Sequence, residues 1–218
     1  MSGEFITLFT ASFVTFFVLI DALGVAPVFA SMTAQGSPSY RRSMAVRSVL
    51  IGTLIIFGFA FFGSWLLNQL HITIDAFRAA GGILLFIIAI DMVFERRTER
   101  RENRAESVMA DSEASLAEEP DDVSVFPLGI PMLAGPGSIA TAMLYMSQSD
   151  DWVAKGAVLA AIAANMVICL IVFLIAGPLV KAMGQSIAAA ITRIFGVILA
   201  ALSVQLLIDG IKGAFGLA

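Results

Sequence analysis

Six long apolar stretches most strongly limit how this chain can fold. Each contains about 20 or more mostly apolar residues, enough to cross a bilayer as a helix. They lie at about 5–33, 44–69, 74–94, 124–147, 153–181 and 187–211. Only 14% of the 218 residues are charged and 59% are hydrophobic, which leaves too few polar side chains to cover a soluble domain. The first stretch follows Glu4 with no Lys or Arg before it, so we expect a retained segment. The sequence predicts an all-α polytopic membrane protein.

Two of the six stretches contain residues that interrupt a helix. Prolines and glycines punctuate the segment 129–138 within the fourth stretch, and the segment 21–27 within the first. Proline removes a backbone donor and clashes with the preceding turn, and glycine adds backbone freedom. Each backbone group left unpaired in hydrocarbon costs several kcal/mol, so a break is tolerated only where it is buried or lines a cavity. We therefore expect helices 1 and 4 to be broken near the bilayer midplane.

An internal repeat relates the two halves of the chain. Pro27 and Pro136 occupy matching positions in the two interrupted stretches, and Arg78-x-x-Gly81 matches Arg193-x-x-Gly196 further on. Each half reads as a broken helix, a plain helix and a helix that opens with Arg-x-x-Gly. Because three spans is an odd number, the second half enters the membrane from the opposite side. The sequence predicts two inverted three-helix repeats, 1–95 and 123–218.

The segment 96–122 joins these repeats. Arginines at its start are followed by acidic and small residues without apolar periodicity. This pattern is typical of a mobile aqueous linker, with a regulatory or docking role as the alternative.

The distribution of basic residues predicts the orientation. Ten of the 13 Lys and Arg residues lie in or beside the loops near 34–43, 95–123 and 182–192, whereas the other side has only Arg78, Lys155 and Lys212. Cytoplasmic loops carry the excess of Lys and Arg. We expect the ten-residue side to be cytoplasmic and both termini to lie outside.

The two breaks are the candidate substrate site. The second half of a broken helix begins with free N–H groups, here near Val25–Pro27 and Pro136–Ser138, and the first half ends in free carbonyls. A zwitterion needs donors for its carboxylate and acceptors for its ammonium group, and backbone alone supplies both. Small side chains leave space for a small ligand. The predicted binding residues are Asp21, Ala22, Gly24, Pro27, Pro131, Gly135, Pro136, Gly137 and Ser138. The alternative is that the kinks only shape helix packing.

Three charged residues have two interpretations each. Asp21 lies within a break, where an acid is a functional candidate that could exchange a proton, or it caps the second half-helix. Arg78 and Arg193 open the third and sixth stretches, where they act as gates or extend their side chains to the membrane surface.

The remaining polar residues point to no catalytic chemistry. Asp91 and Asp209 lie near segment ends and are expected at the membrane interface, while Asn165 and Gln205 are expected to hydrogen-bond between helices. The chain has one histidine, His71, and one cysteine, Cys169. This composition argues against a zinc site and against a Ser-His-Asp hydrolase. We expect no catalytic residue, metal or cofactor.

Several motifs along almost the whole chain carry a family resemblance. They are Asp21-x-x-Gly24-x-x-Pro27-x-Phe29, Arg78-x-x-Gly81-Gly82, Pro127-Leu128-Gly129-Ile130-Pro131-x-x-x-Gly135-Pro136-Gly137 and Arg193-x-x-Gly196 through Asp209-Gly210. With these motifs the chain resembles the MarC-like family of bacterial inner-membrane proteins, also called the neutral amino acid transporter family. In that family the first break usually holds Asp-Pro or Asn-Pro, whereas Ala22 stands here. The resemblance implies a multi-pass inner-membrane carrier of small neutral amino acids such as glycine and alanine, coupled to a proton or cation.

These observations together predict a secondary transporter of small neutral amino acids that works by alternating access. Its expected partners are the amino acid, membrane lipid and a coupling proton or cation, with no nucleic acid and no defined oligomeric state. An exporter of another small metabolite or drug is the alternative within transport. A non-transporting membrane scaffold is the alternative from a different class.

Overall fold

The computed structural model describes residues 2–94, 96, 100, 102–103, 122–149 and 151–217. These residues form helices joined by turns, without a strand in the described part of the chain. The elements are α1 (Ser2–Ile20), α2 (Ala22–Met32), α3 (Pro38–Gln69), α4 (Ile74–Val93), η1 (Ser124–Leu133), α6 (Pro136–Gln148), α7 (Trp152–Leu174) and α8 (Ala176–Phe215).

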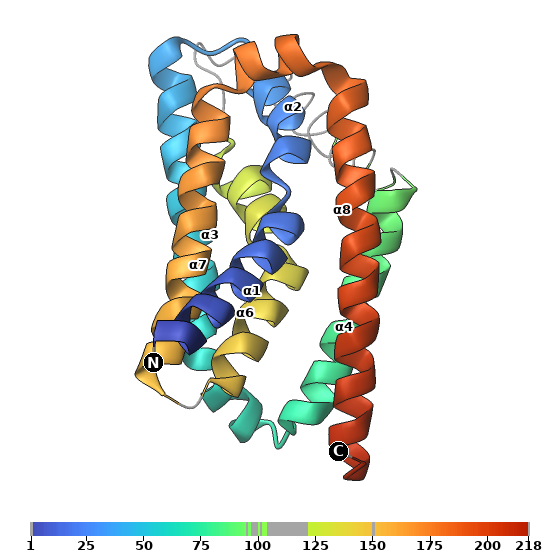
Figure 1. Ribbon diagram of the computed structural model, residues 1–218. Helices are drawn as coiled ribbons and strands as arrows, with labels where there is room; N and C mark the ends of the chain where they lie inside the picture. Colours follow the sequence, from blue (N-terminus) through green and yellow to red (C-terminus); the bar gives the residue numbers. More distant parts are fainter. Residues whose placement is uncertain are drawn as a thin grey trace.

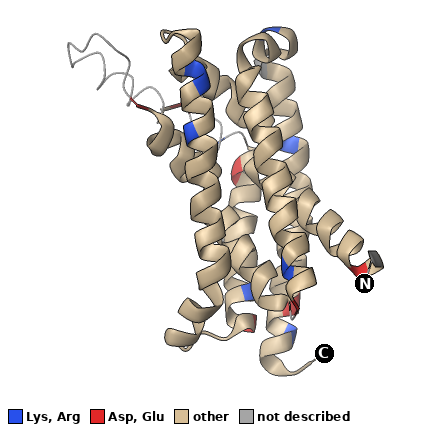
Figure 2. Ribbon diagram, turned by 90° about the vertical axis from the view of Figure 1, so that its left-hand side faces the viewer, with Lys and Arg blue, Asp and Glu red and all other residues tan. Residues whose placement is uncertain are grey.

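The helices run back and forth along one bundle axis (Figure 1). In the part of the chain that the structure describes, five spans are long and apolar enough to cross a membrane, or six when the bent pair η1–α6 is counted as one span. Both chain ends lie toward the lower end of the bundle in Figure 1, while α2 and the first part of α8 lie at the upper end. Figure 2 shows most of the charged residues in view toward the two ends of the bundle, with one acidic residue nearer its middle. A hydrocarbon environment favours this distribution, because charged side chains are costly there. The prediction of an all-α membrane protein is confirmed.

Short polar motifs begin three of these helices. Ser37, Thr73 and Asp151 are the N-cap residues of α3, α4 and α7, and their side chains accept hydrogen bonds from the backbone N–H three residues later at 3.1, 3.2 and 2.6 Å. Each bond satisfies a donor that has no partner within the helix.

Glycines bring α4 and α8 close together. A Cβ atom at Gly82 would lie 2.7 Å from the backbone nitrogen of Leu207, and one at Gly210 would lie 2.6 Å from that of Ala79. Close backbone approach through small residues is how membrane helices commonly associate, because lipid provides little hydrophobic drive between them. The two helices therefore pack as one antiparallel pair.

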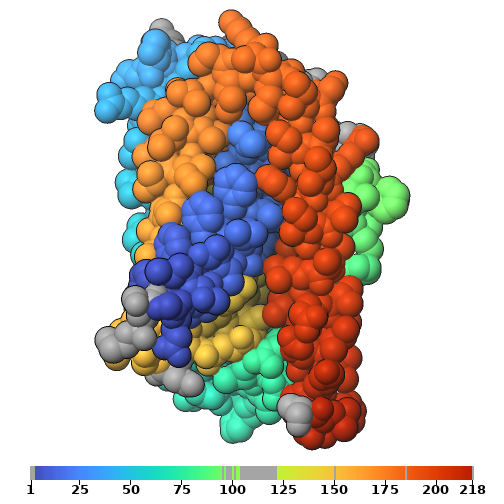
Figure 3. All heavy atoms as spheres, viewed as in Figure 1, coloured from blue at the N-terminus to red at the C-terminus, as the bar shows by residue number. Residues whose placement is uncertain are grey.

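The core lies where α1, α2, η1 and α7 meet. Phe16, Val25, Leu128 and Ile162 are almost fully buried there. On the face shown in Figure 3, α1 and α2 lie between α7 and α8. Large apolar side chains such as Leu54, Phe62 and Trp65 of α3 point outward, which suits a surface in contact with lipid.

The end of the fifth span differs from the predicted segment. The fifth stretch was expected to continue to 181, but α7 ends at Leu174, and α8 begins at Ala176 along the upper end of the bundle. Gly184 then turns the chain at φ 70°, a conformation that glycine adopts without steric cost, and the last span runs from Ser186 to Phe215. The turn at Gly184 falls in the predicted loop 182–192, whereas the break at Ile175 lies in an apolar run and hydropathy alone did not mark it.

Most of the predicted linker 96–122 lies outside the described residues. At its end, Asp122 forms a 2.6 Å ion pair with Arg47 of α3 and accepts a hydrogen bond from the backbone N–H of Ser124 at 2.9 Å. Burial raises the pKa of Asp122, but the hydrogen bonds from Ser124 and the charge of Arg47 outweigh it and hold that pKa below its ordinary value. These contacts fix the start of η1 against α3.

Candidate functional site

The fourth apolar stretch is strongly bent where η1 meets α6. Phe126 and Ile130 have extended backbone angles, and the peptide bonds to Pro127 and Pro131 are cis. The axes of η1 and α6 differ by 56°. Gly135 is the N-cap residue of α6 and provides no capping side chain. Among the residues that the structure describes, the first N–H groups of α6 therefore have neither an intrahelical acceptor nor a capping oxygen.

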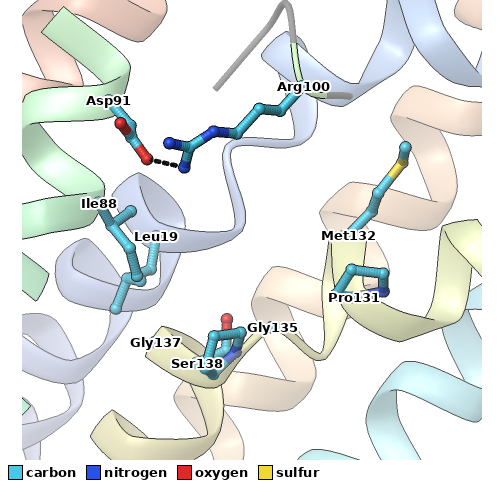
Figure 4. Close-up of a pocket in the computed structure, with 10 residues that line it drawn as sticks. Leu19, Ile88, Asp91, Arg100, Pro131, Met132, Gly135, Gly137 and Ser138 are labelled. Carbon is cyan, nitrogen blue, oxygen red and sulfur yellow. Dashed lines mark hydrogen bonds and ion pairs between the residues drawn. The ribbon is translucent and has the colours of Figure 1, made fainter. Parts of the chain in front are cut away.

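A cavity of about 320 Å³ lies at this N-terminus (Figure 4). This volume is at the lower end of the roughly 300–1,000 Å³ typical of small-molecule sites. Five predicted binding residues from η1 and α6 line it together with residues from α1, α4 and the segment after α4. The lining residues are Leu19, Ile88, Asp91, Arg100, Pro131, Met132, Gly135, Pro136, Gly137 and Ser138.

Gly137 is where α6 comes closest to α1 and α4. A Cβ atom there would lie 2.7 Å from Cδ1 of Ile88 and 2.9 Å from Cδ2 of Leu19, and both of these side chains line the cavity. A side chain at position 137 would push them toward the cavity or occupy it. The glycine thus keeps the helix N-terminus accessible.

One charged pair lines the cavity. Asp91 of α4 and Arg100 form an ion pair, in which the arginine Nη1 donates to the carboxylate Oδ2. The Asp91 side chain is 11% exposed, whereas that of Arg100 is 64% exposed. The expectation that Asp91 is merely interfacial therefore missed its place in the cavity wall. That place depends on how α4 packs against α6, which spacing along the chain does not reveal.

The predicted break in the first apolar stretch differs from the bend between η1 and α6. Asp21 adopts a left-handed conformation, with φ 51° and ψ 56°, between α1 and α2. Backbone hydrogen bonds continue through it, because its N–H donates to the Phe17 carbonyl at 3.2 Å and its carbonyl accepts from Val25 N–H at 3.0 Å. The expected start of the second half-helix near Val25–Pro27 is wrong. The helix begins at Ala22, and Pro27 lies inside α2.

Asp21 is fully buried and its side chain fills the N-terminus of α2. Oδ1 accepts from the Gly24 N–H at 3.2 Å. The Thr192 hydroxyl of α8 donates to the carboxyl group, at 3.1 Å from Oδ2 and 3.3 Å from Oδ1. The capping geometry predicted for Asp21 is present, and Thr192 is a partner that the sequence did not reveal. Four predicted binding residues, Asp21, Ala22, Gly24 and Pro27, lie at this junction and do not line the cavity.

The two arginines considered as gates lie apart from the cavity lining. Arg78 contacts Asp75 at 3.2 Å, and with its amide oxygen turned toward the guanidinium group, Gln148 at the end of α6 accepts from its Nε at 2.9 Å. This contact joins α4 to α6. Arg193 is exposed on α8, directly after Thr192.

Two other polar residues differ in their partners. Asn165 of α7 donates to the Phe13 carbonyl of α1 at 3.1 Å, which confirms the predicted bond between helices. Gln205 instead donates to Asp209 of its own helix at 2.9 Å, so a bond between helices was the wrong expectation. In the described part of the chain, no three His, Cys, Asp or Glu side chains are grouped to hold a metal ion.

Comparisons with known proteins agree on one family. The model of the MarC family of integral membrane proteins matches residues 6–215. The "UPF0056 membrane protein MJ1677" of Methanocaldococcus jannaschii is 34% identical over 94% of this chain and 97% of its own length. Escherichia coli YhcE, also named a UPF0056 membrane protein, is 32% identical over 93% of this chain and 91% of its own. No solved structure matches. The chain therefore belongs to the MarC family of integral membrane proteins.

Proposed function

We propose that this protein is a secondary transporter that carries small neutral amino acids through the cavity at the N-terminus of α6. The observation that carries the proposal is the contrast between the two helix N-termini. At α2, the carboxyl group of Asp21 occupies the anion position. At α6, the N-cap residue Gly135 provides no side chain for it, and a cavity lies there instead. A helix N-terminus attracts anions, so the carboxylate of a bound amino acid takes the place that Asp21 takes in α2.

The size and lining of the cavity favour a small substrate. Gly135 and Gly137 expose backbone at one wall, while Leu19 and Ile88 contribute apolar surface. A glycine or alanine molecule fits such a space. Pro131 and Met132, at the end of η1, complete this part of the lining.

We further propose that the two halves form inverted repeats broken near the bilayer midplane. The packing of the helices supports this proposal, because each part of an interrupted span packs against a helix of the other half. The first part of each interrupted span packs against the plain helix of the other half, as α1 packs on α7 and η1 on α3. The second part packs against the last helix of the other half, as α2 packs on α8 and α6 on α4. Such repeats allow one half to rock against the other around a central site.

Two polar contacts between these halves suit gates for alternating access. Asp21 and Thr192 join α2 to α8, and Arg78 and Gln148 join α4 to α6. Breaking one contact while keeping the other would open one side at a time. Asp21 is also the proposed site of a coupling proton. We also propose that the protein lies in the inner membrane, as the family resemblance implies, and that both termini lie outside, as the distribution of basic residues predicts.

Counterflow in proteoliposomes tests the function. Vesicles loaded with one unlabelled amino acid at high concentration are diluted into a trace of the same compound with a radiolabel. We expect transient accumulation of glycine and alanine, weaker accumulation of larger neutral amino acids and none of glutamate or lysine. Protein-free vesicles are the control. Failure of every neutral amino acid to accumulate, with protein that is folded and inserted, would refute the proposal.

A further inference from the structure

The acid in the cavity wall has a partner that differs sharply from it in exposure. Asp91 is 8% exposed as a residue, and apolar groups such as Leu19 and Ile88 line the same cavity. A carboxylate in such surroundings requires a positively charged or hydrogen-bonding partner. Here that partner is Arg100, whose side chain is largely exposed. The acid belongs to the rigid wall formed by α4, and the arginine reaches it from outside the helix.

The geometry of the cavity separates this charge from the N-terminus of α6. Figure 4 shows Asp91 and the tip of Arg100 on one side, and Gly135, Gly137 and Ser138 on the opposite side. The arginine side chain points toward the carboxylate and occupies the position in front of it. A zwitterion with its carboxylate at α6 would direct its ammonium group toward this same position.

We infer that Asp91 binds the ammonium group of the substrate and that Arg100 occupies the ammonium position while the cavity is empty. This inference rests on the proposed function, which it deepens by naming the residue that recognises the positive end. An ammonium group and a guanidinium nitrogen are both strong donors to a carboxylate, so either one satisfies Asp91. Binding then exchanges one cation for another, and the buried acid is never left without a partner.

Replacing Asp91 and replacing Arg100 should change the affinity for alanine in opposite directions. Removing the carboxylate removes a charge-assisted hydrogen bond from the complex, whereas removing the arginine removes a competitor for the same position. Asp91→Asn keeps the side-chain volume and should weaken alanine binding by about tenfold or more. Arg100→Gln should strengthen alanine binding, because the substrate no longer has to displace a cation. A guanidinium group that instead bound the substrate carboxylate would make Arg100→Gln bind alanine more weakly.

Calorimetric titration of the purified, detergent-solubilised full chain tests the inference with three probes. Alanine carries both charged groups, ethylammonium only the positive one and propionate only the negative one. We expect Asp91→Asn to lose affinity for alanine and ethylammonium while its affinity for propionate stays unchanged. Asp209→Asn is the matched control, since Asp209 is an acid near the end of α8 that does not line the cavity. Arg100→Gln changes an exposed side chain and provides a variant that is expected to fold normally.

The outcomes separate this inference from the proposed function. If wild type binds alanine and Asp91→Asn binds it equally well, the inference is overturned and the function stands. If wild type binds ethylammonium in an Asp91-dependent manner but not alanine, the ammonium site stands and the amino acid substrate is overturned. If wild type binds neither compound, both are overturned. Unchanged or weaker alanine binding by Arg100→Gln would overturn the inference that the substrate displaces Arg100 from Asp91.

Discussion

Replacing Gly24 with alanine should break the contact between α2 and α8. A Cβ atom at Gly24 would lie 2.2 Å from Oδ2 of Asp21 and 2.5 Å from the Thr192 hydroxyl. Both distances are far below a van der Waals contact, so the Asp21 carboxyl group and Thr192 would have to move apart. The Asp21 side chain cannot swing away freely, because it is fully buried and caps α2.

The expected cost follows from the bonds that would be lost. The Asp21 cap contributes about 0.5–2 kcal/mol. The hydrogen bond from Thr192, if it is made to an ionised carboxylate, contributes about 1.5–3 kcal/mol. The better helix propensity of alanine returns roughly 1 kcal/mol. We therefore expect Gly24→Ala to lower the free energy of unfolding by about 1–4 kcal/mol.

Unfolding by SDS in mixed micelles, followed by circular dichroism, measures this change. Gly58→Ala in α3 is the matched control, because a Cβ atom there meets nothing within 4 Å and the variant should be neutral or slightly more stable. In a Thr192→Ala background, Gly24→Ala should cost less, since one of its two clashes is gone. Equal stability of Gly24→Ala and Gly58→Ala would refute the account of this junction.

Three further variants probe the site and the orientation. Gly137→Val should insert normally but lower alanine affinity by about tenfold, or about 1.4 kcal/mol. Its side chain would compete for space with Ile88 and Leu19 beside the cavity. Titration with alanine measures this change, and unchanged affinity would place the ligand elsewhere. Asp21→Asn should keep alanine exchange but lose uptake driven by a pH gradient if Asp21 carries the coupling proton; preserved uptake would leave only the capping role. In a Cys169→Ala background, Gly3→Cys should react with an impermeant thiol reagent in intact cells and Gln35→Cys should not; the reverse pattern would overturn the proposed orientation.

Apolar length predicted most of the helices, because this signal is local. The N-cap residues Ser37, Thr73 and Asp151 locate the starts of α3, α4 and α7 more closely than hydropathy does. The turn at Gly184 lies in the predicted loop 182–192, but the break at Ile175 escaped prediction because the residues around it are apolar. The start of α2 was misplaced because Pro27 looked like the stronger breaker, whereas Asp21 ends α1 through its left-handed backbone.

The candidate site was only half visible in the sequence. The prolines and glycines of the segment 131–138 marked it as a break, and six of its residues line the cavity, five of them predicted binding residues. Asp91 and Thr192 gave no such signal, since one lies near a helix end and the other is a small polar residue in an apolar run. Their roles depend on the packing of α4 against α6 and of α8 against α2, which brings together residues from different halves of the chain.

The central claim is that a small neutral amino acid occupies the cavity at the N-terminus of α6. Protection of an introduced cysteine tests it most directly. Ser138 lines the cavity and is 3% exposed, so Ser138→Cys in a Cys169→Ala background reports on the space beside the helix N-terminus. We predict that alanine slows the reaction of this cysteine with a small methanethiosulfonate, which forms a mixed disulfide with the thiol, while the reaction of Gln35→Cys, on an exposed turn, is unaffected. Reaction of Ser138→Cys at the same rate with and without saturating alanine, in folded protein, would contradict the claim.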